Sequence, residues 1–260
     1  MTDHFNTLSF PRSREIVMDA GRLGSRRHLI HGLVEFDITL ARQYLREQKA
    51  ATGESLSFTA FIAASLARAI QEYPMLQAYR SWRNQLIIYD EVDVVVMIEA
   101  EKDKVAIPHV LRGADHKSFR ELNQEIRQVQ AAPRSSPQTR GLSHWGQYAP
   151  YWVRRLFYGL LLRNPRRFQQ YGGTVVITSV GMFGKGGGWG IGFLPMHTLG
   201  LTLGGISEKL TLQEGQLEVR EYLCLTVSVD HDIVDGAPAA RFTQRLRELV
   251  EGGDVLFAEG

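Results

Sequence analysis

The chain has 260 residues, of which 44% are hydrophobic and 22% are charged, a composition too apolar for a disordered protein. Its formal net charge of +2 at pH 7 excludes nucleic-acid binding through a global excess of basic residues. A single cysteine, Cys224, excludes an internal disulfide and a metal site made of several cysteines, and it indicates a reducing compartment such as the cytoplasm.

The first part of the chain predicts alternating strands and helices. Residues 1–30 lack the apolar core of a signal peptide, and no apolar run reaches the roughly 20 residues needed to cross a bilayer, so we expect no integral membrane protein. We predict a strand over 32–38 and a helix over 39–53. Apolar residues at three- and four-residue steps predict a second helix over 57–73, which Pro74 ends.

The middle of the chain continues this pattern. Two segments rich in β-branched residues, 86–89 and 92–100, predict strands, and the second is apolar enough to lie inside a sheet. A capping box begins at Ser118 and predicts a helix with one buried face. Residues 132–140 are rich in Pro, Ser and Arg and predict an exposed loop.

The last third predicts mainly strands. We place them at 174–180, 198–206 and 217–229, followed by a closing helix with Pro238 in its first turn. Strands flanked by several helices predict an α/β fold, a mixed β-sheet with flanking helices, in a single domain spanning 1–260.

The strand that ends at Asp230 runs into a turn with the pattern H-x-x-x-D-G, which contains His231, Asp235 and Gly236. The strand fixes the backbone, so the turn after it can present an imidazole to a channel. An imidazole titrates near neutral pH and can take a proton from a thiol or hydroxyl, typically accelerating a reaction by ~100 to 10,000-fold. We therefore expect His231 to be a general base, and Asp235 to orient the turn by pairing with an arginine.

Two other interpretations of this turn remain open from the residues alone. The chain contains eight histidines, and one beside an aspartate is often a satisfied surface residue. Asp232 and Asp235 beside His231 also suggest a metal site, but no second histidine or cysteine falls at ligand spacing nearby, so we expect no metal.

Several stretches of the sequence together resemble one known family. They are Tyr89 to Asp93, Lys117 to Leu122, Gly172 to Gly184, and Val227 to Ala237 followed by Ala239 to Phe242. In order and spacing they resemble the catalytic domain of the dihydrolipoyl acyltransferase component of 2-oxo acid dehydrogenase complexes, which is related to chloramphenicol acetyltransferase. The resemblance runs from about His31 to Val250.

This resemblance implies a trimeric, chloramphenicol acetyltransferase-like fold with active sites between subunits. Coenzyme A or an acyl-coenzyme A is then a substrate, and it meets an acceptor thiol of dihydrolipoyl type in a channel. His231 takes the position of the catalytic base. The hydroxyl that stabilises the oxyanion falls on Thr178, next to Ser179, and a fixed donor of this kind is typically worth about 3 kcal/mol. From the residues alone, both hydroxyls are equally consistent with simple strand positions.

The chain departs from the family pattern in three places. No lipoyl domain, subunit-binding domain or Ala/Pro-rich linker precedes the catalytic region, so we expect no lipoyl group on this chain and a lipoyl or carrier domain acting in trans. Ile30 stands where the family usually has a proline before His31. At about 141–171 an aromatic and basic insertion replaces a shorter connection.

For two segments, and for the function itself, the sequence leaves more than one interpretation open. Aromatic and aliphatic residues alternate with arginines over 151–168, which fits packing on the chain's own trimer, docking of a partner protein, or contact with an anionic membrane or nucleic acid. The glycine-rich run 184–190 suggests a mobile gate. Beside the acyltransferase stands a non-catalytic trimeric scaffold or assembly subunit, and whether trimers assemble further is open. We expect no nucleic acid as a partner.

Overall fold

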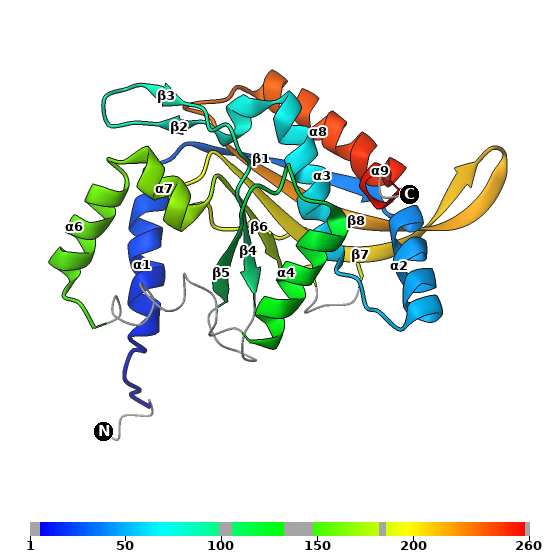
Figure 1. Ribbon diagram of the computed structural model, residues 1–260, viewed down its shortest axis with the longest axis horizontal. Helices are drawn as coiled ribbons and strands as arrows, with labels where there is room; N and C mark the ends of the chain where they lie inside the picture. Colours follow the sequence, from blue (N-terminus) through cyan, green and yellow to red (C-terminus); the bar gives the residue numbers. More distant parts are fainter. Residues whose placement is uncertain (1–5, 99–105, 133–147, 182–185, 258–260) are drawn as a thin grey trace, which may run out of the picture.

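A mixed sheet of six strands carries the fold in the computed structural model, which describes residues 6–98, 106–132, 148–181 and 186–257 (Figure 1). The strand order is β1–β8–β7–β6–β4–β5, with β4, β6 and β7 parallel and the other neighbours antiparallel. The strands are β1 (Leu29–Asp37), β4 (Val94–Ile98), β5 (Ile107–Leu111), β6 (Val175–Ser179), β7 (Leu199–Gln213) and β8 (Gln216–Asp230).

Helices cover one face of this sheet and form the main apolar core with it (Figure 1). They are α2 (Thr39–Thr52), α3 (Phe58–Glu72), α4 (Phe119–Ala131), α8 (Gly236–Gly252) and α9 (Asp254–Phe257). Ser57 starts α3 by accepting a hydrogen bond from the amide of Ala60, and the predicted capping box of Ser118 and Glu121 starts α4. Phe242 of α8 and Phe61 of α3 are fully buried in this core.

Side chains alternate between the two faces along a strand, and on β7 and β8 the opposite face is polar, whereas on β4 and β5 it carries Val95 and Val110. On β8 this face carries Cys224, Thr226, Ser228 and Asp230, all buried. A glycine-rich layer, residues 186–194, lies against it. The amide of Gly192 donates to Thr202 Oγ1 at 3.0 Å, and a Cβ at Gly192 would come within 2.2 Å of that oxygen. Glycine is therefore required for this close approach.

A third group of elements lies at one end of the molecule (Figure 1). It contains α1 (Ser13–Gly24), α6 (Tyr151–Leu161), α7 (Pro165–Gly172) and the hairpin of β2 (Tyr79–Arg80) and β3 (Leu86–Ile87), while the short helix η1 (Pro74–Gln77) joins α3 to this hairpin and places Leu76 in the main core. The buried Arg154 of α6 pairs with Asp19 and Glu15 of α1, each at 2.6 Å. Tyr79 stacks on Phe168 of α7 with ring centroids 4.7 Å apart.

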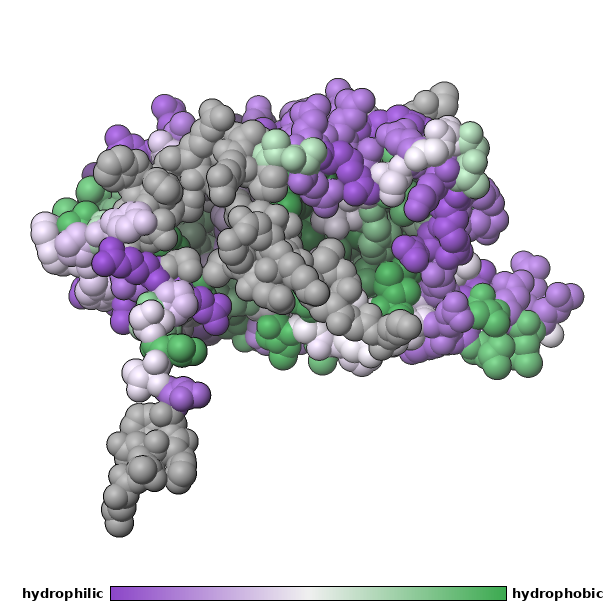
Figure 2. Space-filling view, turned by 90° about the horizontal axis from the view of Figure 1, so that it is seen from below, coloured by the Kyte–Doolittle hydropathy of each residue, from purple (hydrophilic) through white to green (hydrophobic). Residues whose placement is uncertain are grey.

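At the other end, β7 and β8 extend beyond the sheet as a two-stranded arm (Figure 1). Leu210 pairs with Val219 and Leu212 with Leu217, so these four side chains share one face of the arm. They are 61–72% exposed, and Figure 2 shows the apolar patch at this end of the molecule. We call these four residues the apolar arm face.

The structure confirms the predicted mixed sheet and its flanking helices, and it corrects several boundaries. Strand β7 continues to Gln213, beyond its predicted end at Ile206, whereas β8 agrees with the predicted strand over 217–229 to one residue at each end. The predicted strand over 86–89 is only the short β3. Helix α1 and strand β5 were not predicted. The predicted loop at 132–140 falls, apart from Ala132, outside the described residues.

Candidate active site

His231 lies in a tight turn directly after β8. Its amide donates to the carbonyl of His28 at 2.8 Å, and the amides of Ile233 and Val234 donate back to the carbonyl of Asp230. The backbone of the turn is therefore fixed, while the side chain of His231 is 47% exposed. The described part of the chain leaves this ring open on one side, in the position expected of a base that meets a substrate or a neighbouring subunit.

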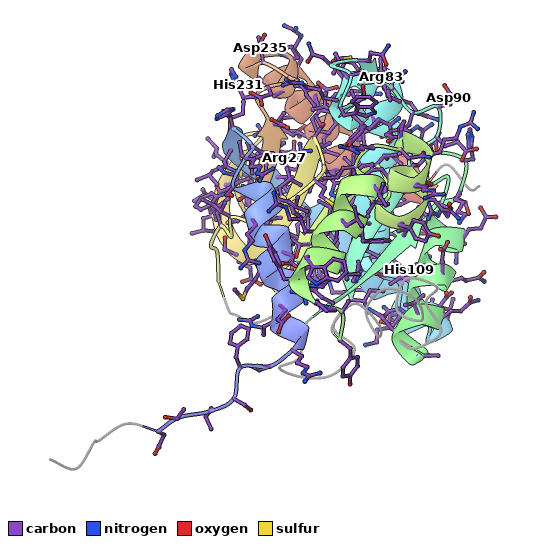
Figure 3. All side chains as sticks on the ribbon, turned by 90° about the vertical axis from the view of Figure 1, so that its left-hand side faces the viewer. Arg27, Arg83, Asp90, His109, His231 and Asp235 are labelled. Atoms are coloured by element: carbon purple, nitrogen blue, oxygen red, sulfur yellow. The ribbon has the colours of Figure 1, made fainter. Side chains whose placement is uncertain are left out.

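A buried ion pair supports the turn from below. Asp230 is 4% exposed and pairs with Arg27, which also donates to the carbonyls of His197 at 3.2 Å and Met196 at 2.5 Å. Figure 3 shows Arg27 beneath His231 and Asp235, whereas His109 lies at the far end of the molecule. Since a buried carboxylate requires a cation and hydrogen bonds, Arg27 fixes the end of β8 and hence the start of the turn.

A second carboxylate holds the other side of the turn. Asp232 Oδ1 lies 2.9 Å from Nδ1 of His28, and Arg80 Nη1 lies 3.8 Å from its other oxygen. The hydrogen bond from His28, followed by the charges of His28, Arg80 and Arg27, holds the pKa of Asp232 below its usual value. Both carboxylates that flank His231 are thus engaged by cationic or hydrogen-bonding partners.

Among the described residues of one chain, Asp235 does not form the arginine pair predicted for it. Its side chain is 82% exposed and pairs with no arginine among the described residues; its nearest partner there is Nε2 of His231, at 3.9 Å. Asp235 occupies the N-cap position of α8 without a side-chain cap. The arginine that orients the turn is Arg27, and it acts on Asp230 instead. Residue patterns could not identify Arg27, because its partner is 203 positions away.

The two predicted hydroxyls lie on different faces of the sheet. Thr178 is opposite Thr202, which is opposite Thr226, so the three threonines form a row on the polar face across β6, β7 and β8. Ser179 is opposite Leu203, a core residue, and therefore belongs to the helix-covered face. Thr178 therefore lies on the same face of the sheet as Asp230, the residue that directly precedes His231.

Within one chain Thr178 and His231 do not meet. Thr178 lies two strands from β8, and His231 lies five residues beyond Thr226 along β8. With strands about 4.8 Å apart and ~3.3 Å per residue, the two positions are separated by roughly 19 Å. A site that uses both groups therefore requires a second copy of the chain.

The described part of the glycine-rich run is bonded to the sheet at two positions, and its role as a gate stays a prediction. Gly188 donates to Cys224 Sγ at 3.3 Å, and the indole of Trp189 donates to the carbonyl of Val34 at 3.0 Å. These bonds hold Gly188 and Trp189 against the sheet, while residues 186–189 are exposed on their outer side. Met182 to Lys185, which include part of the second family stretch, lie outside the described residues.

His197 is a buried histidine near the turn. Its Nε2 lies 2.6 Å from the carbonyl of Gly172, and burial lowers the pKa of its imidazole to about 4. The ring is therefore neutral at pH 7 and donates to that carbonyl. Across the described ranges, no three His, Cys, Asp or Glu side chains gather as metal ligands would. Nor does any helix in those ranges combine the length and apolarity needed to span a membrane.

Comparison with known proteins decides the family. Residues 30–139 and 164–258 match the model of the family described as 2-oxoacid dehydrogenases acyltransferase (catalytic domain). The chain belongs to this family. The resemblance seen in the sequence is thereby confirmed, and the family model leaves out the segment between 139 and 164, which contains α6.

Curated relatives of this acyltransferase domain are longer proteins. The lipoamide acyltransferase component of the branched-chain alpha-keto acid dehydrogenase complex of Bacillus subtilis is 22% identical over 85% of this chain and 46% of its own length. The dihydrolipoyllysine-residue acetyltransferase component of the pyruvate dehydrogenase complex of Rickettsia bellii is 26% identical over 75% of this chain and 40% of its own. The chain therefore spans less than half the length of these relatives.

Solved structures show the same fold. The dihydrolipoamide acetyltransferase of Azotobacter vinelandii superposes with a TM-score of 0.73 at 21% identity, covering 98% of this chain and 96% of that one. A probable dihydrolipoamide acetyltransferase from Listeria monocytogenes gives 0.71 at 22% identity, covering 96% and 95%. Chloramphenicol acetyltransferase gives 0.54 at 15% identity, covering 96% of this chain and all of that one.

Proposed function

We propose that this chain transfers an acyl group between coenzyme A and a thiol of dihydrolipoyl type, with His231 as the general base. The observation that carries the proposal is the rigid turn after β8, which leaves the His231 ring open while Arg27 and Asp230 fix its backbone. His231 takes the proton from the acceptor thiol, the thiolate attacks the thioester carbonyl, and a hydroxyl stabilises the oxyanion. The intermediate then collapses: the bond between the acyl carbon and the coenzyme A sulfur breaks, and the departing thiolate takes the proton back from His231. Family membership supports this reaction class.

The choice of oxyanion donor rests on two observations that favour different residues. Thr178 lies on the polar face with Asp230, which favours Thr178. In the Azotobacter vinelandii enzyme, a serine, a histidine and an asparagine have been studied for their role in catalysis, and the serine precedes the histidine by 52 positions. Ser179 precedes His231 by the same interval. The asparagine follows that histidine by four positions, as Asp235 follows His231 here.

Two variants test the general base. Purified protein is given acyl-coenzyme A donors of different chain length, and acyl transfer to dihydrolipoamide is measured. His231→Ala should reduce kcat/KM by ~100 to 10,000-fold, since the loss of a general base removes that much acceleration. His116→Ala, an exposed histidine on the surface, is the matched control and should keep wild-type activity. Equal inactivity of all three proteins would favour the alternative, a non-catalytic scaffold.

The donor is identified by two further substitutions. Removal of one oxyanion donor costs about 100 to 1,000-fold in kcat. Thr178→Val and Ser179→Ala each remove one hydroxyl at little change in volume, so only the variant of the true donor should lose activity on this scale. If neither does, a different group stabilises the oxyanion.

We also propose that the protein works as a homotrimer, with a lipoyl or carrier domain supplying the acceptor in trans. Two observations support the oligomer: the separation of Thr178 from His231 within one chain, and the apolar arm face, which is unusually apolar for a solvated hairpin. Sedimentation of the wild-type protein should give a trimer. Leu210→Lys/Leu217→Lys should dissociate it and abolish transfer, whereas Gln216→Lys at the tip of the same arm should do neither. A monomeric variant with full activity would contradict a site shared between subunits.

A further inference from the structure

A cavity of about 390 Å³ lies beside the His231 turn, and none of the catalytic steps proposed above assigns it a role. It lies between the C-terminal ends of α1 and α6 and the β2–β3 hairpin, elements that Figure 1 shows together at one end of the molecule. Asp230, Asp232 and Ile233 form one wall. The cavity therefore contacts the two residues that flank His231.

Four arginines line this cavity against only two carboxylates. Arg27 is already committed to Asp230, and Arg80 lies 3.8 Å from Asp232, which His28 also holds. Across the described residues, the guanidinium groups of Arg26 and Arg163 form no ion pair. Arg163 lies over the indole of Trp82, 6.0 Å from its centroid.

Such an excess of one charge around a hollow points to an anionic ligand. Like charges repel, and a concave wall of one sign concentrates the opposite charge from solution. A carboxylate has two oxygens and is satisfied by one bidentate arginine, whereas a phosphate presents three terminal oxygens to several guanidinium groups. The free arginines on two sides of the cavity therefore fit a phosphate better than a carboxylate.

The cavity also accommodates more than the anion. Its volume exceeds that of a phosphate group, and Leu23, Leu162 and Met196 provide apolar wall between the arginines. A phosphate ester fills both parts, with the phosphate against the arginines and an organic group against the apolar side chains.

Part of the site lies outside the matched family region. Arg26 precedes residue 30 and Arg163 precedes residue 164, so both fall outside the matched ranges, while Arg80 and Trp82 fall inside them. The buried pair of Arg154 and Asp19 joins α1 to α6, the two helices after which Arg26 and Arg163 follow. The insertion thus adds Arg163, and the segment before residue 30 adds Arg26, to a cavity next to the His231 turn.

We propose that this cavity binds a phosphate ester, held by Arg26, Arg80 and Arg163 with its organic part against Leu162 and Met196. The inference does not depend on acyl transfer, because binding is measured without turnover. It deepens the proposed function only if the phosphate belongs to the coenzyme A substrate.

Calorimetry with phenyl phosphate as the probe tests the site. The wild-type protein should bind it, should bind more weakly as salt is raised, and should not bind benzyl alcohol. Arg26→Gln/Arg163→Gln should weaken binding at least tenfold. The control Arg14→Gln/Arg155→Gln removes one exposed charge from each of the same two helices and should keep wild-type affinity. No binding by the wild type, or equal weakening in both double variants, would overturn the proposal.

Two further measurements identify the source of the phosphate and separate the two proposals. If adenosine 3′,5′-bisphosphate displaces phenyl phosphate, and loses affinity in the same double variant, the ligand is part of coenzyme A. If both bind together, a separate phosphorylated compound occupies the cavity. His231→Ala should bind phenyl phosphate with wild-type affinity even though it is inactive. An active enzyme that does not bind phenyl phosphate would refute this inference without affecting the proposed acyl transfer.

Discussion

The two faces of the sheet use the same strands for different purposes. On β8, Val227 and Val229 join a core that α3 and α8 close completely. Their neighbours Thr226, Ser228 and Asp230 are equally buried, but beneath a glycine-rich layer and an arginine. One face is thus closed by apolar packing, and the other is polar and leads to His231. Because successive side chains of β8 point to opposite faces, one set contributes to the stability of the core and the other set to the polar face that leads to His231.

This comparison predicts the largest loss of stability on the helix-covered face. Phe242 is fully buried and its ring lies 6.1 Å from that of Tyr73. Phe242→Ala leaves a cavity that close-packed neighbours cannot fill, so the free energy of unfolding should fall by about 3–5 kcal/mol. Denaturant unfolding at fixed protein concentration measures it. Phe242→Leu should lose clearly less, and equal losses for both variants would show that the face is not tightly packed.

The second prediction concerns pH and the polar side of the molecule. The pKa of His197 is lowered by burial to about 4 in the folded protein, while an unfolded histidine titrates near 6.5. Between these values the unfolded state binds more protons, so the free energy of unfolding decreases as the pH falls through this window. The total decrease should be about 3 kcal/mol. The stabilising contribution of neutral His197 is therefore complete above pH 6.5 and is lost as the pH falls towards 4.

The variant His197→Gln isolates this contribution. A glutamine amide can still donate to the carbonyl of Gly172, but it does not titrate. The difference in stability between wild type and variant should therefore change with pH over this window. Parallel curves would mean that His197 is not buried as a neutral ring.

Local signals in the sequence were sufficient for the helix-covered face. Ser57 and Ser118 mark the starts of α3 and α4, and apolar residues at helical spacing give the buried stripes. The alternation along β8 also predicts which side chains share a face, and it places His231 at the strand end. These features depend on neighbours a few residues away, which is why the sequence reveals them.

The polar side depends on contacts that are distant in the sequence. Arg27 meets Asp230 across 203 positions, and Arg154 meets Asp19 across 135. Within the chain Arg27 reaches Asp230 and not Asp235, because the motif shows a carboxylate at the right spacing but not which carboxylate an arginine reaches. Strand β5 was not predicted because it contains Pro108, and a proline argues against a central strand. It is tolerated here because β5 lies at the edge of the sheet.

The smallest effect, and the sharpest test of the comparison, lies in the threonine row of the polar face. Thr226 is fully buried, and its hydroxyl has no hydrogen-bond partner among the described residues. Thr226→Val replaces that hydroxyl with a methyl group of similar shape, so the free energy of unfolding should stay unchanged or rise by about 1 kcal/mol. Thr202→Val should instead lower it by about 1–2 kcal/mol, because the amide of Gly192 loses its acceptor. The same substitution at adjacent positions should thus lower the free energy of unfolding at Thr202 but not at Thr226. A comparable loss at both positions would mean that Thr226 is hydrogen-bonded in the assembled protein, and that the polar face is as fully satisfied as the helix-covered one.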